Sequence, residues 1–200
     1  MYDPNASAEE TLRLLVEGNR RFASGACRHP NTDLARVIEL STSGQKPFAA
    51  VIACSDSRVP VERVFDRGVG DLFVVREAGN VCGTLAAASL EFAVTVLGCG
   101  VIVVMGHTGC GAVQAACSAD RQSDTVEALL HPIRETARSE RDKPGEGTLE
   151  ERVTSANVMR SAWDLERASP AVADARRAGT LVIAPAVYDL STGVVEWLEG

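Results

Sequence analysis

Four short apolar runs, rich in β-branched and small residues, alternate along the chain with longer segments of helical periodicity. They cover about residues 48–53, 72–76, 101–106 and 181–184. Continuous apolar runs of this length are typical of strands buried on both faces of a parallel sheet. A fifth apolar segment, 194–198, follows a turn signal at 189–193, so it should return as the second strand of a hairpin. The pattern predicts an α/β fold: a mostly parallel central sheet of four strands plus an antiparallel C-terminal strand, flanked by helices.

Helical signals occupy the chain before the first strand. Ser7 and Glu10 form a capping-box pattern, and apolar residues at helical spacing continue from there towards Gly25. A second, shorter helix is predicted over about 33–40. Residues 1–44 would then form a helical arm, followed by an α/β core over 45–200, within one domain that spans residues 1–200.

Later helices are marked mainly by their ends. Pro60 suits the first position of a short helix, and Gly98 ends a longer one that begins near Thr84. Residues 119–180 are densely charged and rich in helix formers. Pro132, the segment 143–147 and Ser169-Pro170 interrupt them, which predicts two or three surface helices.

Composition narrows the class of protein. The chain has 200 residues, of which 46% are hydrophobic, and a formal net charge of -7. This charge argues against binding to nucleic acid or to an anionic membrane by bulk electrostatics. No apolar stretch is long enough to span a membrane, and the N-terminal residues do not resemble a signal peptide. We therefore expect a cytoplasmic protein whose six cysteines are not joined in disulfides.

Chemically active residues follow two of the predicted strands. Cys54-Ser55-Asp56-Ser57-Arg58 comes directly after the first, and His107-Thr108-Gly109-Cys110 after the third. If these strands are neighbours, both segments lie at the carboxyl edge of the sheet, where α/β proteins bind ligands. Two cysteines and one histidine suit zinc and leave a fourth position to fill. A structural zinc site remains an alternative, although the chain lacks the Cys-x-x-Cys pairs typical of one.

Asp56 and Arg58 are two residues apart, so in an extended segment they point to the same side. On their own they would be read as a plain ion pair. Beside a zinc ion with a free position, Asp56 could either pair with Arg58 or take the fourth coordination position.

These motifs resemble those of the β-class carbonic anhydrases. The similarity also covers residues 17–22, 59–60, 70–76, 78–80 and 106–112. It implies one zinc ion per chain, held by Cys54, His107 and Cys110. It also implies reversible hydration of carbon dioxide to bicarbonate and a proton by hydroxide on the zinc. Asp56 and Arg58 would be the catalytic pair, with Asp56 on the metal in an inactive state.

The resemblance also assigns a substrate pocket. Gln45 would be an amide donor reaching across a subunit interface, and Phe73 a lining aromatic residue. Phe92 stands where many members carry tyrosine, and Gly111 would let substrate approach the metal. A homodimer or tetramer is implied, with the helical arm packed on the partner subunit. The alternative is that the arm covers the chain's own sheet.

Two other functions use the same residues. Hydrolysis of carbonyl sulfide or carbon disulfide would need the same metal ligands. A nucleotide-binding module could use the glycine-rich turn at 106–111 before a helix. The glycine spacing there does not match the dinucleotide fingerprint, and His107 and Cys110 occupy the turn.

Overall fold

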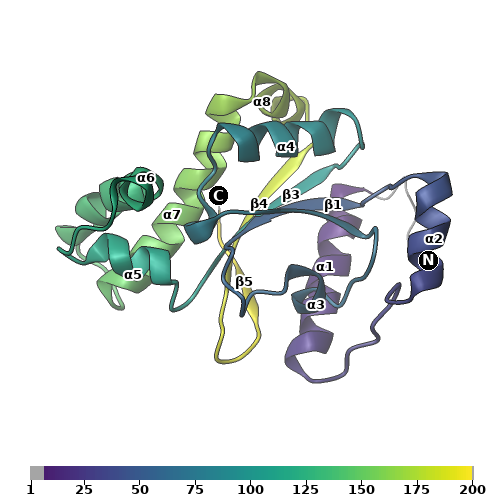
Figure 1. Ribbon diagram of the computed structural model, residues 1–200, viewed down its shortest axis with the longest axis horizontal. Helices are drawn as coiled ribbons and strands as arrows, with labels where there is room; N and C mark the ends of the chain where they lie inside the picture. The colour runs from purple at the N-terminus through teal and green to yellow at the C-terminus, as the bar shows by residue number, and fades with distance from the viewer. Residues whose placement is uncertain (1–6, 200) are drawn as a thin grey trace.

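A five-stranded sheet between layers of helices forms the body of the molecule (Figure 1). The structure is a computed structural model that describes residues 7–199. In chain order the elements are α1 (Ala8–Ala23), α2 (Leu34–Ser43), β1 (Ala49–Ala53), α3 (Val61–Val64), β2 (Leu72–Arg76), the 3-10 turn η1 (Ala78–Asn80), α4 (Thr84–Thr95), β3 (Val101–His107), α5 (Gly111–Cys117), α6 (Asp124–Arg141), α7 (Leu149–Ala168), α8 (Pro170–Arg177), β4 (Val182–Tyr188) and β5 (Val195–Trp197).

The strand order is β2-β1-β3-β4-β5. The first four strands are parallel and β5 is antiparallel to β4, so the predicted sheet is confirmed. β1 and β3 are hydrogen-bonded neighbours, with Ala53 opposite Met105. The segments that follow these two strands therefore lie side by side at the carboxyl edge of the sheet.

Two hydrophobic cores cover the two faces of the sheet. Ile52 and Val104 point into the core formed with α4, α7 and α8. Val51 and Val103, one residue earlier in each strand, point into the core formed with α1 and α3. Alternate residues of a strand face opposite sides. The uninterrupted apolar runs of β1 and β3 are therefore explained by helices on both faces, as Figure 1 shows.

The helix α1 covers part of the chain's own sheet. Leu15 is fully buried in the core beneath it. Asn19 donates to the carbonyls of Val64 and Gly193 and accepts from the backbone N–H of Val195. Residues 1–6 of the predicted arm lie outside the described residues.

The helix α2 stands apart from the layers (Figure 1). It has no buried residue. It lies beside the turn that precedes β2, where Val69 donates its backbone N–H to the carbonyl of Asn31.

Three helices lie in the charged stretch, as the sequence predicted, and α7 packs more deeply than the other two. α7 packs on β3 and β4 and buries a face that includes Val153, Val158 and Leu165. α6 continues through Pro132, which was expected to interrupt it. None of the helices within residues 7–199 is long and apolar enough to cross a membrane.

Candidate metal centre

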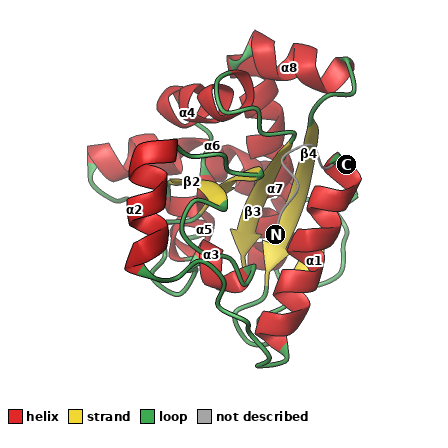
Figure 2. Ribbon diagram, turned by 90° about the vertical axis from the view of Figure 1, so that its right-hand side faces the viewer, coloured by secondary structure: helices red, strands yellow, loops and turns green. Residues whose placement is uncertain are grey.

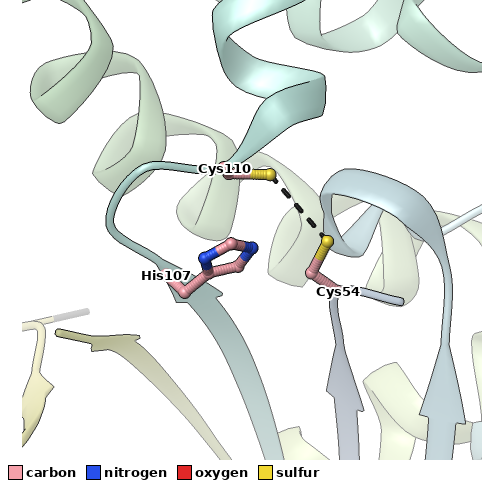
Figure 3. A group of neighbouring side chains, drawn as sticks. All are labelled: Cys54, His107 and Cys110. Carbon is pink, nitrogen blue, oxygen red and sulfur yellow. Dashed lines mark hydrogen bonds between the residues drawn. The ribbon is translucent and has the colours of Figure 1, made fainter. Parts of the chain in front are cut away.

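The side chains of Cys54, His107 and Cys110 converge at the carboxyl edge of the sheet (Figure 3). Cys54 follows β1 directly, His107 is the last residue of β3, and Cys110 precedes the first residue of α5. The three ligand atoms lie within 4.8 Å of one another, and all three residues are buried. The two sulfur atoms are 3.9 Å apart. The fold therefore joins the two halves of the predicted ligand set.

The ring of His107 is fixed in one tautomer. Its Nδ1 lies 2.9 Å from the carbonyl oxygen of Thr108, and a carbonyl can only accept, so Nδ1 carries the hydrogen. Nε2 is left with a lone pair. This buried nitrogen has no hydrogen-bond partner among the described residues. An unpartnered buried acceptor is costly, and a metal ion would satisfy it.

The sulfur atoms of the two cysteines are in hydrogen-bonding contact, and either thiol can be the donor. The contact with the Cys110 thiol lowers the pKa of Cys54 against the effect of burial, and the backbone N–H groups of Asp56 and Gly79 lower it further. The same contact, together with burial, raises the pKa of Cys110. A divalent cation would replace the proton and stabilise both thiolates. With the neutral His107 nitrogen, the donor set fits zinc.

A second group of potential ligands, Cys27, His29 and Asp66, lies beside the C-terminal turn of α1. Here the carboxylate of Asp66 is already engaged. It accepts from Nε of Arg21 at 2.5 Å and from the backbone N–H groups of Arg28 and His29. A metal would have to displace the Arg21 cation, so we assign no metal to this group.

Asp56 is held by Arg58 at the mouth of the centre. Its Oδ1 accepts from the backbone N–H and Nε of Arg58, at 2.8 and 3.0 Å, and its Oδ2 accepts from a terminal guanidinium nitrogen at 2.7 Å. These hydrogen bonds from Arg58 hold the pKa of Asp56 far below its usual range. Oδ2 also lies 3.8 Å from Nε2 of His107. The structure therefore has Asp56 paired with Arg58 and facing the three ligands.

Supporting residues surround this loop, and the sequence pattern assigned them no role. The guanidinium of Arg76 donates to the carbonyls of Cys54 and Asp56. Gly79 donates its N–H to the sulfur of Cys54, and Asn157 donates to the carbonyl of Gly79. Of the three, only Asn157 could have been noticed in the sequence, because it is an amide one turn after the apolar Val153 on the buried face of a helix.

The residues expected to line a substrate pocket are not gathered at this centre. Gln45 is exposed and precedes β1, so it lies at the amino ends of the parallel strands, whereas Cys54 lies at their carboxyl ends. Phe73 and Phe92 contact each other, with ring centroids 6.4 Å apart, where α4 packs on β2. Gly111 does begin α5 beside Cys110, and a Cβ there would meet nothing within 4 Å. Within one chain, only Gly111 of these four lies beside the ligands.

Comparison with known proteins agrees with this geometry. The family model described as carbonic anhydrase matches residues 49–195. The carbonic anhydrase of Mycolicibacterium smegmatis is 37% identical over 196 residues, 96% of this chain and 94% of that protein. That of Pseudomonas aeruginosa is 36% identical over 200 residues, covering 94% and 88%. A chain from the tetrameric β-carbonic anhydrases of Sordaria macrospora shares the fold with a TM-score of 0.74 at 23% identity, covering 96% and 98%.

Proposed function

Because the chain belongs to the β-class carbonic anhydrase family, we propose that it binds one zinc ion per chain through Cys54, His107 and Cys110. Its reaction is the reversible hydration of carbon dioxide. The relatives matched here bear the name carbonic anhydrase, which favours carbon dioxide as the substrate over carbonyl sulfide or carbon disulfide.

One observation carries the zinc proposal. The buried Nε2 of His107 has a lone pair and no partner among the described residues, and it lies beside two buried sulfurs that are 3.9 Å apart. Hydrogen bonds among the three side chains leave this nitrogen without a partner. A divalent cation would be coordinated by the nitrogen and both sulfurs at once.

The surrounding residues prepare the site for hydration. When bound, zinc supplies Lewis-acid activation of water, so that hydroxide is available near neutral pH. Asp56 remains ionised at neutral pH because Arg58 holds its pKa low. An ionised carboxylate accepts hydrogen bonds and donates none. Asp56 therefore orients the attacking hydroxyl group and does not act as a proton donor.

Arg58 keeps Asp56 away from the metal. Its three hydrogen bonds occupy both oxygens of the carboxylate, and its guanidinium is itself fixed by the carbonyl of Gly109. Released from Arg58, Asp56 would take the fourth coordination position and block water. The site is therefore active while Asp56 is paired with Arg58, and it would be inactive once Asp56 leaves Arg58 for the metal.

Zinc content measured together with carbon dioxide hydration on the same sample tests the proposal. We expect one zinc per chain in the wild type, and loss of both metal and activity in Cys54→Ala, His107→Ala and Cys110→Ala. Cys82→Ala is the matched control, because Cys82 is also a buried thiol but belongs to the core under α4. Full zinc occupancy in all three ligand variants would overturn the assignment.

We further propose that the active unit is a homodimer formed at the β2 edge of the sheet. β2 is the outermost strand on that side, so the structure leaves one of its edges unpaired by any described strand. The neighbouring α2 exposes an apolar stripe of Leu34, Val37 and Ile38, and Figure 2 places α2 and β2 on the same side of the molecule. Exposed strand edges and apolar patches of this kind favour association.

A two-fold axis at this edge would also complete the substrate pocket. If that axis is perpendicular to the strands, it reverses their direction, so the amino ends of one sheet come near the carboxyl ends of the other. Gln45 of one subunit could then reach the metal ligands of its partner. Phe73 and Phe92, next to the same edge, would line the approach, and Gly111 would leave space beside the ligand Cys110. The Sordaria enzymes are tetrameric, and pairing of two such dimers is our proposal for this chain as well.

A further inference from the structure

The sulfur of Cys54 is held by a loop that follows a different strand. It accepts a hydrogen bond from the backbone N–H of Asp56 at 3.4 Å, within its own loop. It accepts a second from the N–H of Gly79 at 3.2 Å. Gly79 lies in η1, directly after β2, and has a φ of 66°. The direction of the sulfur therefore depends on where this turn sits.

Gly79 is confined tightly. A Cβ at this position would lie 2.5 Å from Cδ1 of Ile133 on α6 and 3.1 Å from Cβ of Ala112 on α5. The positive φ also favours glycine. Glycine is therefore favoured at the point where the turn packs against α5 and α6 and meets the Cys54 sulfur.

Asn157 holds the turn from its other side. Its Nδ2 donates to the carbonyl of Gly79 at 2.8 Å, and the side chain is 1% exposed. No other donor to this carbonyl is found among residues 7–199. The neighbouring buried threonine, Thr154, returns its hydroxyl to its own helix at the carbonyl of Glu150. Asn157 is thus the polar side chain of α7 that reaches out to the turn.

We propose that Asn157 is a positioning residue of the metal centre, which acts through Gly79 to orient the Cys54 sulfur and so strengthens metal binding. The inference rests on the proposed zinc site. Residues that hold a ligand in place from behind preorganise it for the metal. Without the Asn157 amide, the Gly79 carbonyl is buried without a donor, and the turn shifts to find one. The N–H of Gly79 then leaves the sulfur.

Asn157→Leu and Asn157→Asp test the role in the full-length protein. Leucine removes the donor at similar size, and aspartate keeps the shape but sets an acceptor against the Gly79 carbonyl. Thr154→Val is the matched control, one turn away on the same buried face, because the Thr154 hydroxyl bonds to the carbonyl of Glu150 in its own helix and not to the turn. We would measure zinc affinity by competition with a chelator, the sulfur-to-metal absorption bands of the cobalt(II)-substituted protein, and thermal unfolding of the metal-free form.

We expect both Asn157 variants to bind zinc about 10- to 100-fold more weakly and to shift the cobalt bands. Thr154→Val should change neither. Failure of the wild type to bind zinc or cobalt would overturn the metal site itself. Wild-type binding with unchanged affinity and spectrum in the Asn157 variants overturns the positioning role alone. Should Asn157→Leu not fold, the equal-sized Asn157→Asp decides the question.

Discussion

At the scale of single residues, the clearest prediction concerns the pairing of Arg58 with Asp56. Three hydrogen bonds from one guanidinium and one backbone N–H keep the carboxylate off the ligands. Arg58→Ala removes two of the three. We expect hydration activity to fall by about 100-fold, the order observed when one preorganised group is lost from a site.

The control is Arg63→Ala, an exposed arginine on the nearby α3, which should keep wild-type activity. A crystal structure of Arg58→Ala with zinc would show Asp56 on the metal. Asp56 turned away from the zinc in that crystal would mean that another group holds it.

Asp66 predicts a pH dependence of stability. Burial alone would raise its pKa, but hydrogen bonds from Arg21 and from the N–H groups of Arg28 and His29 outweigh it and lower the pKa. A carboxyl group with a lowered pKa in the folded state adds stability above its unfolded pKa of about 3.9 and loses it as the pH falls further. Asp66→Asn should therefore cost about 2 kcal/mol at pH 7.

Urea unfolding of the wild type and Asp66→Asn at several pH values checks this. The difference in free energy of unfolding between them should be constant above the unfolded pKa of Asp66. It should then shrink as the pH falls towards the folded pKa. A difference that is constant down to the lowest pH at which the wild type still folds would contradict the assignment.

At the scale of elements, strand positions followed closely from the sequence, because buried parallel strands leave continuous apolar runs. The end of β4 did not. The run 181–184 stops at Pro185, yet the strand continues to Tyr188. The carbonyl of Pro185 accepts a hydrogen bond from the backbone N–H of Leu198, just past the last paired residue of β5. The N–H and C=O of one strand residue point to the same neighbouring strand. The N–H that proline lacks would therefore point towards β5 and not towards β3, so the pairing of β4 with β3 is intact.

Gly106 shows how one element fixes the distance of another. A Cβ there would lie 2.6 Å from Cγ2 of Val158, so only glycine lets α7 pack this closely on β3. Gly106→Ala should push α7 outwards and lower the free energy of unfolding by about 1–3 kcal/mol. It should also weaken metal binding, because His107 is the next residue and α7 carries Asn157.

Gly100→Ala is the matched control for this substitution. Its Cβ would lie 3.7 Å from the carbonyl oxygen of Thr180, an ordinary contact. Chemical unfolding and zinc affinity of the two variants would be compared. Equal results for both would show that α7 is not held by this close approach.

At the scale of the whole molecule, the sequence motifs predicted that Cys54, His107 and Cys110 lie together, because each half of the motif follows a strand whose carboxyl end the sheet brings to the same place. They did not predict how far Gln45 lies from this group within one chain. Cys54 and Gln45 are nine residues apart in the sequence, but β1 separates them, so they lie at opposite edges of the sheet. Spacing along a strand carries no information on a neighbouring subunit. The contact of Asn157 with the turn was equally hidden, because it joins segments 78 residues apart.

The proposed dimer therefore predicts complementation between two inactive chains. Gln45→Ala keeps the metal ligands but lacks the amide that its partner needs, whereas Cys110→Ala lacks a ligand but still offers Gln45. If Gln45 acts across the interface, a mixed dimer of these variants contains one intact site. Co-expression should restore hydration activity that neither variant has alone. Pairing Cys54→Ala with Cys110→Ala is the control and should stay inactive, because both lack a ligand in their own chain. A fully active wild-type monomer by light scattering, or no restored activity in mixed dimers shown to form, would mean that each chain builds its pocket alone.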